Sequence, residues 1–170
     1  MSVAYKAKNI TDSLCEKLYA HHSVMIHSLL DLQSFSITYA PKLAEPITMK
    51  KKIFLVKLKS DLGWANKQER KMYYYVRYAQ SYSKEPILRN IPFLIKVNDE
   101  LLRRIIYAKN SYDKLDGLCQ GKLSREKFGL EAWHGKLTLM TRVPMLFGSA
   151  EKECKEIKMI LSQLAAITKK

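Results

Sequence analysis

A stripe of mostly apolar side chains, spaced three or four residues apart, runs along the amino-terminal part of the chain. It comprises Leu14, Leu18, His22, Met25, Leu29 and Leu32. This spacing returns to one face of an α-helix, whereas a strand would need strict alternation. Similar stripes recur later, and only 6 glycines and 5 prolines interrupt the 170 residues. The pattern therefore predicts an all-α fold: a single-domain helical bundle of five to seven helices over residues 1–170.

Capping residues and prolines predict where these helices begin and end. Helix starts are expected at Ser13, Asn66, Asn98, Ser124 and Ser149, whose side chains can accept from free backbone amides. Residues 35–46 contain two prolines and predict a connector with a short extended piece. Residues 48–60 are rich in β-branched and aromatic side chains but also fit helical spacing, so either a strand or a helix is open and a helix is favoured.

Positive charge is concentrated in one stretch of the chain. The net charge is +14, and residues 50–109 hold 15 Lys and Arg against 5 Asp and Glu. Residues 1–49 hold 4 of each kind, and residues 110–170 hold 11 against 7. A localised cationic surface attracts polyanions, because neutralised phosphates release their condensed counterions. The distribution predicts a nucleic-acid partner, RNA or DNA, contacted mainly through the backbone.

Residues 67–84 combine this charge with aromatic rings on one side of a predicted helix. At 100° per residue, one wedge of about 100° holds Lys67, Arg70, Tyr74, Arg77 and Lys84, with Tyr78 at its edge. Met72, Val76 and Ala79 point the other way, so the helix can bury one side. Cations contact phosphate oxygens, and an aromatic ring stacks on an unpaired base for about 1–3 kcal/mol.

Two further basic segments extend the predicted nucleic-acid-binding set. They contribute Lys96, Arg103 and Arg104 on the next helix, and Lys50, Lys51, Lys52, Lys57 and Lys59 before the first. A solvated charged surface would explain any one segment, but three adjacent segments of one sign favour binding, because like charges repel. Together they predict a groove, in which Arg70, Arg77 and Arg103 should matter most, since a guanidinium fork suits phosphate.

No catalytic or metal-binding pattern accompanies the basic surface. His21, His22 and His27 lack the spacing of three or four residues that helical metal ligands need, and His22 lies on the core stripe. Residues 117–124 have three residues between glycines where a phosphate loop has four. The sequence therefore predicts no enzyme, no metal and no cofactor.

The cellular setting follows from the cysteines and the hydropathy. Cys15, Cys119 and Cys154 are odd in number and widely spaced, which argues against a disulfide framework and favours a reducing compartment. No apolar run reaches the roughly 18 residues of a spanning helix, and residues 1–10 lack a signal-peptide core. A cytoplasmic protein without a membrane partner is expected.

The helix pattern and the basic faces of residues 67–84 and 96–104 resemble the helical small subunits of multisubunit CRISPR effector complexes of the Cascade type. The resemblance covers the chain at the level of architecture and matches no diagnostic motif. It implies a noncatalytic subunit in antiviral defence that stacks in several copies along a ribonucleoprotein complex and stabilises guide RNA with target DNA. The alternative is a helical adaptor or inhibitor whose basic groove holds an acidic protein partner.

Overall fold

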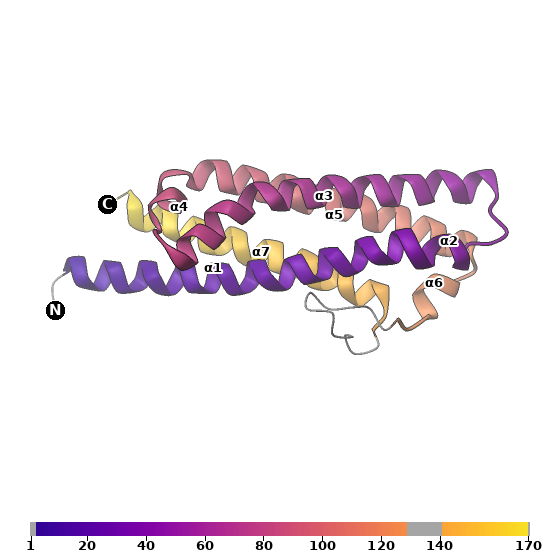
Figure 1. The fold of residues 1–170 in the computed structure, drawn as a ribbon, viewed down its shortest axis with the longest axis horizontal. Helices are drawn as coiled ribbons and strands as arrows, with labels where there is room; N and C mark the ends of the chain where they lie inside the picture. The colour runs from indigo at the N-terminus through magenta and orange to yellow at the C-terminus, as the bar shows by residue number, and fades with distance from the viewer. Residues whose placement is uncertain (1–2, 129–140, 170) are drawn as a thin grey trace.

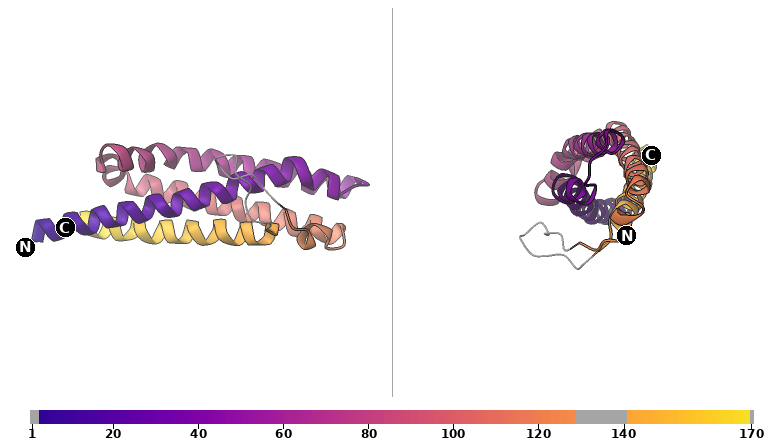
Figure 2. Two further views of the ribbon diagram at one scale, coloured as in Figure 1. Left: turned by 60° about the horizontal axis from the view of Figure 1, so that its bottom comes forward. Right: turned by 90° about the vertical axis from the view of Figure 1, so that its right-hand side faces the viewer.

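The computed structural model describes residues 3–128 and 141–169 and confirms the all-α bundle. The long helices are α1 (Val3–Ser34), α3 (Met49–Ser81), α5 (Ile91–Leu118) and α7 (Val143–Thr168). The short ones are the π-helix η1 (Phe35–Tyr39), α2 (Ala40–Leu43), α4 (Glu85–Arg89) and α6 (Lys122–Arg125). Each long helix packs against the next one in the chain, and α7 closes the ring by packing against α1 (Figures 1 and 2). This is the up-down-up-down arrangement of a four-helix bundle.

Helix α3 is longer than predicted, because residues 48–60 and the segment after Asn66 form one continuous helix. The side chain of Thr48 caps it by accepting from the Lys51 amide at 3.3 Å. Asn66 lies inside the helix, so its predicted role as a cap is wrong. Leu62 and Ala65 are both buried and carry the apolar stripe across the predicted boundary. Burial of this face outweighs the weak strand preference of the first segment.

The prediction of a connector with an extended piece over residues 35–46 is wrong for residues 35–43, which are helical, and only residues 44–46 belong to the connection to α3. The chain continues from α1 through the π-helix into α2, and Phe35 and Ala40 are buried there. The Phe35 ring packs edge-on against Tyr112, with centroids 6.0 Å apart. Pro41 sits in the first turn of α2, where it cannot donate a hydrogen bond to the preceding turn. The wider turn of the π-helix lies directly before Pro41, which has no amide hydrogen to donate.

The other long helices begin earlier than their predicted caps. Ser13, Asn98 and Ser149 all lie inside helices, because α1, α5 and α7 begin at residues 3, 91 and 143. Pro92 and Pro144 stand in the first turns of α5 and α7. Proline is favoured at such positions because the first helical amides have no partner in the helix. Most of the helix predicted from Ser124 lies outside the described residues.

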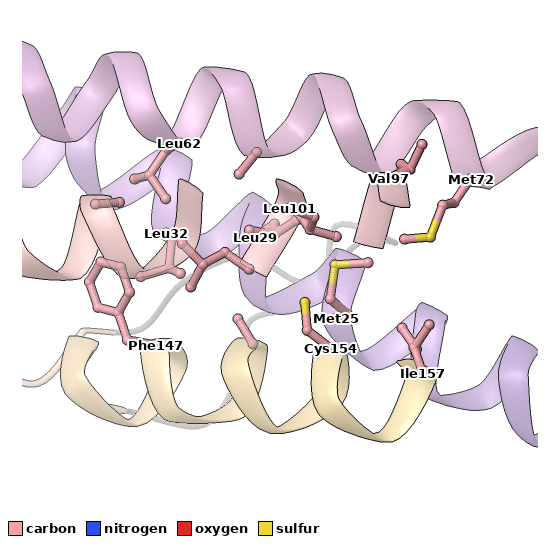
Figure 3. Packing of buried hydrophobic residues seen from close by; sticks show 14 of the residues in the cluster. Met25, Leu29, Leu32, Leu62, Met72, Val97, Leu101, Phe147, Cys154 and Ile157 are labelled. Atoms are coloured by element: carbon pink, nitrogen blue, oxygen red, sulfur yellow. The ribbon is translucent and has the colours of Figure 1, made fainter. Parts of the chain in front are cut away.

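The core lies between the four long helices, each of which contributes large side chains. Figure 3 shows Met25, Leu29, Leu32, Leu62, Met72, Val97, Leu101, Phe147, Cys154 and Ile157 facing one another across the bundle. His22 is buried beside this cluster, as predicted from its position on the stripe of α1. Each long helix packs one face into the core, so the opposite, solvent-exposed faces are the surfaces available for binding.

One buried polar side chain ties two of these helices together. Asn98 is buried in α5, and its Nδ2 donates to the Cys154 carbonyl of α7 at 2.8 Å. We expect Asn98→Ala to lower the free energy of unfolding by about 1–3 kcal/mol, because the bond is lost and a small cavity is left. Urea denaturation measures the change. Asn110→Ala, on the exposed side of α5, should change it by less than about 0.5 kcal/mol; equal losses in both variants would contradict the role of Asn98.

Candidate nucleic-acid interface

Helix α3 presents cations to solvent and turns its acids inward. Of its residues, nine are Lys or Arg and two are acidic. Glu69 is buried, and Asp61 is half-buried against Arg104 of α5, with Asp61 Oδ1 3.4 Å from Arg104 Nη1. The solvent-exposed surface of α3, called here the outer face, therefore carries positive charge with no acid of its own helix to offset it.

The predicted wedge of cations and rings lies on this outer face. Lys67, Arg70, Tyr74, Arg77 and Tyr78 are all exposed. Met72, Val76 and Ala79 are buried, which confirms the predicted orientation of the helix. The Lys67 ammonium lies 4.9 Å from the centre of the half-exposed Trp64 ring. Cations and aromatic rings therefore lie next to each other on α3. Surfaces that bind single strands combine these two groups, since the cations contact phosphates and the rings stack on bases.

Lys84 does not belong to this face, contrary to the prediction. Helix α3 ends at Ser81, and Lys84 stands before the first turn of α4. Its Nζ lies 3.2 Å from Asp12 Oδ1 of α1. The prediction failed because it extended the helical period past the end of the helix.

The predicted lysines of residues 50–59 occupy the opposite end of α3. Lys50, Lys52, Lys57 and Lys59 are exposed. Lys51 instead serves the fold, since its Nζ donates to the carbonyls of Ala44 at 3.0 Å and Pro46 at 3.2 Å. From Lys50 to Arg77, at 1.5 Å per residue, the cations of α3 extend over about 40 Å. The cations therefore form a long stripe and not a compact pocket.

A groove lies between α3 and α5, but its α3 wall is formed by Gln68 and Lys71 and by none of the predicted α3 cations, and its charge is mixed. A cavity of about 630 Å³, called here the α3–α5 cavity, includes Lys96 and Arg103 in its wall together with Asp99 and Glu100. Arg103 and Arg104 both pair with Glu100, the latter at 3.1 Å. These ion pairs neutralise the two arginines in part, so they are weaker candidates for phosphate contact than the outer face of α3.

A second groove, between α1 and α3, was not predicted. A cavity of about 380 Å³, called here the α1–α3 cavity, is lined by Ile26, Leu30, Asn66, Glu69, Arg70, Tyr73 and Tyr74. Within residues 3–128 and 141–169, no acid forms an ion pair with Arg70. Residues 1–49 are electrically balanced, so charge counting could not reveal that α1 supplies a wall.

Arg77 is held next to this cavity by two phenol groups. Its Nε donates to Tyr73 Oη at 3.3 Å, and its Nη1 donates to Tyr19 Oη of α1. The guanidinium carbon lies 5.7 Å and 5.5 Å from the centres of the Tyr19 and Tyr73 rings. A guanidinium has five N–H donors, so an exposed fork held in this way keeps donors for a phosphate.

Beneath these arginines, His22 of α1 and Glu69 of α3 form a buried pair. His22 Nε2 lies 3.5 Å from Glu69 Oε1, and neither atom has a hydrogen-bond partner among the described residues. Burial and, to a smaller extent, the charge of Arg77 together lower the pKa of His22 to about 4. Burial raises the pKa of Glu69 to about 7, against the opposing effect of Arg70. Both side chains are therefore neutral between these two values.

In the described parts of the chain, no helix is both long and apolar enough to cross a membrane. Comparisons with protein-family models, with curated proteins and with solved structures give no match for this chain. The resemblance to CRISPR small subunits therefore stays a prediction from the helix pattern and the charge.

Proposed function

We propose that this chain is a noncatalytic nucleic-acid-binding subunit of a ribonucleoprotein complex, with α3 as its principal contact element. One observation carries the proposal: α3 exposes a row of cations along its whole length while both of its acids are turned inward. Arg70 and Arg77 are the central contacts, because they are exposed and have no acidic partner in the described parts of the chain. Such a surface binds the phosphate backbone of RNA or DNA.

The aromatic side chains of the outer face, together with Tyr82 directly after α3, favour a single strand over a duplex. Tyr74 is 74% exposed and Tyr82 is 78% exposed. Tyr78 and Tyr82 lie side by side, with ring centroids 5.0 Å apart. Exposed rings beside cations offer stacking surfaces that only unpaired bases can reach.

The amino-terminal half of α3 supports a place within a larger assembly. Met49, Ile53 and Val56 lie on the outer face and are exposed by 46% or more. They are spaced four and three residues apart, so they form one apolar strip among the lysines. An exposed apolar strip of this kind is typical of a surface that contacts a neighbouring subunit.

Salt titration tests nucleic-acid binding directly. A fluorescent single strand of about 12 nucleotides should bind with an affinity that falls steeply from about 50 to about 200 mM salt. About six phosphate contacts predict a log–log slope near −4 to −5. Absence of binding at about 50 mM salt, for single- and double-stranded probes alike, would refute the proposed activity of the isolated chain.

A second candidate function is an adaptor that holds an acidic protein segment. The strip of Met49, Ile53 and Val56, flanked by lysines, favours it, because an amphipathic helix with acidic edges would match both features. This function predicts that the purified protein retains a protein partner and no nucleic acid. Val56→Ser would then weaken binding of the partner, whereas it should change the salt slope of oligonucleotide binding little, because it leaves the charge of the outer face unchanged.

A further inference from the structure

Three side chains from two helices meet at the surface where α1 packs against α3. Arg77 of α3 donates to the phenol oxygens of Tyr73, on its own helix, and Tyr19, on α1. Its guanidinium carbon also lies 5.7 Å from the centre of the Tyr19 ring and 5.5 Å from that of Tyr73. These contacts hold the guanidinium in place before any ligand arrives, so less side-chain entropy is lost on binding.

Together these side chains offer hydrogen-bond donors that the fold does not use. Two of the five N–H groups of the Arg77 guanidinium point to phenol oxygens, so three remain for a ligand. Each phenol oxygen accepts from Arg77, so its own O–H can turn toward another acceptor. In the described parts of the chain, no acidic side chain forms an ion pair with Arg77. The ligand that fits this set is an anion that only accepts hydrogen bonds.

We propose that Tyr19, Tyr73 and Arg77 form a binding site for one phosphate of a nucleic-acid strand. The guanidinium makes charge-assisted hydrogen bonds to the phosphate oxygens, and the two phenol groups hold it there and donate to the same phosphate. Through Tyr19, α1 takes part in binding, although residues 1–49 hold equal numbers of basic and acidic side chains. Tyr19 and Tyr73 are thus positioning residues for Arg77.

The surroundings of the site favour a phosphate within a strand over a small anion. The cavity beside the three side chains has a volume of only about 20 Å³, too small to enclose a ligand, so a phosphate binds from the solvent side. Tyr74 and Tyr78 are exposed on α3, one turn before and one residue after Arg77. A strand held at Arg77 can therefore stack its neighbouring bases on these rings. The inference rests on the proposed function, because it names the residues that hold one phosphate of that interface.

Removal of single hydroxyl groups tests the site. The probe is a labelled oligouridine of about 12 nucleotides with hydroxyl ends. Tyr19→Phe and Tyr73→Phe keep both rings and should each weaken binding by about three- to tenfold, because a hydrogen bond is lost and Arg77 is held less firmly. The salt slope should stay the same, since the charge does not change. Tyr107→Phe, at an exposed position of α5, should change the affinity by less than about twofold.

Variants that lack the guanidinium show whether the phenol groups act through it. Arg77→Gln alone should weaken binding by about tenfold and make the log–log salt slope shallower by about 0.7, as expected for one lost contact with a single strand. Adding Tyr19→Phe to Arg77→Gln should cause less than about twofold further loss, because no phosphate is then held beside the phenol.

Each outcome separates the inference from the proposed function. Unchanged affinity of Tyr19→Phe would mean that the phenol only joins α1 to α3, and equal losses with and without Arg77 would mean that it acts elsewhere. Either result overturns the site and leaves the proposed function standing, because the wild-type chain still binds the strand. Absence of binding by the wild-type chain overturns both. If Tyr19→Phe does not fold, Tyr73→Phe decides by the same comparison, because Tyr73 lies on the same helix as Arg77.

Discussion

Replacement of both Arg70 and Arg77 by glutamate should reduce the affinity for a single-stranded oligonucleotide by about 100-fold or more, because two phosphate contacts become repulsive. Both side chains are exposed on the outer face of α3, so the helix content should not change. The log–log salt slope should become shallower by about 1.5, as expected for two lost contacts. Fluorescence anisotropy at several salt concentrations measures both effects.

The matched control removes the same charge elsewhere. Lys152→Glu with Lys155→Glu alters two exposed residues of α7. This helix packs against α1 and α5 and lies across the bundle from α3 (Figure 2). The control should keep most of the affinity, since distant exposed charges are screened by salt. Equal losses in both double variants would mean that net charge, and not the outer face of α3, drives binding.

Replacement of Glu69 by glutamine should stabilise the fold at pH 8 by about 3 kcal/mol, because the raised pKa makes ionisation of the buried carboxyl unfavourable. A carboxyl whose folded-state pKa is raised contributes full stability below its unfolded value of 4.5 and loses it as the pH rises through about 7. The gain should therefore be below about 1 kcal/mol at pH 5. Urea denaturation of both proteins at the two pH values checks this.

Two comparisons make the stability prediction specific. The lowered pKa of His22 has the opposite pH dependence: it lowers the free energy of unfolding as the pH falls from 6.5 to about 4. His22 is present in both the wild-type chain and Glu69→Gln, so it affects both proteins. Asp61→Asn should not stabilise the fold, because Asp61 pairs with Arg104. A loss of stability in Glu69→Gln at pH 8 would show that Glu69 is ionised and paired with a charged His22.

The fold class was predictable because helical spacing and the scarcity of glycine and proline both favour helices. The boundaries were less predictable. Asparagine is a common helix cap, yet Asn98 lies inside α5, where it is buried and its side chain is hydrogen-bonded to α7. Local sequence cannot distinguish these roles, because the second depends on a helix more than 50 residues away.

The candidate site was predicted in part, for a related reason. Periodicity alone placed Arg70, Tyr74 and Arg77 on one exposed face, because a helix repeats regularly along its own axis. The wall that α1 contributes to the α1–α3 cavity depends on tertiary packing. Tyr19 and Ile26 lie in a segment of balanced charge, so neither composition nor period marked them as neighbours of Arg77 and Tyr73.

The continuity of α3 has a consequence for the entropy of binding. Its cations and rings stand on one uninterrupted helix, packed on one side against α1 and on another against α5, so their spacing is set before any ligand arrives. A basic tail of the same composition would have to be ordered by its ligand, at a cost of about 1–2 kcal/mol for each backbone residue fixed. On α3 only the side chains need to be ordered, and a larger share of the contact energy remains as affinity.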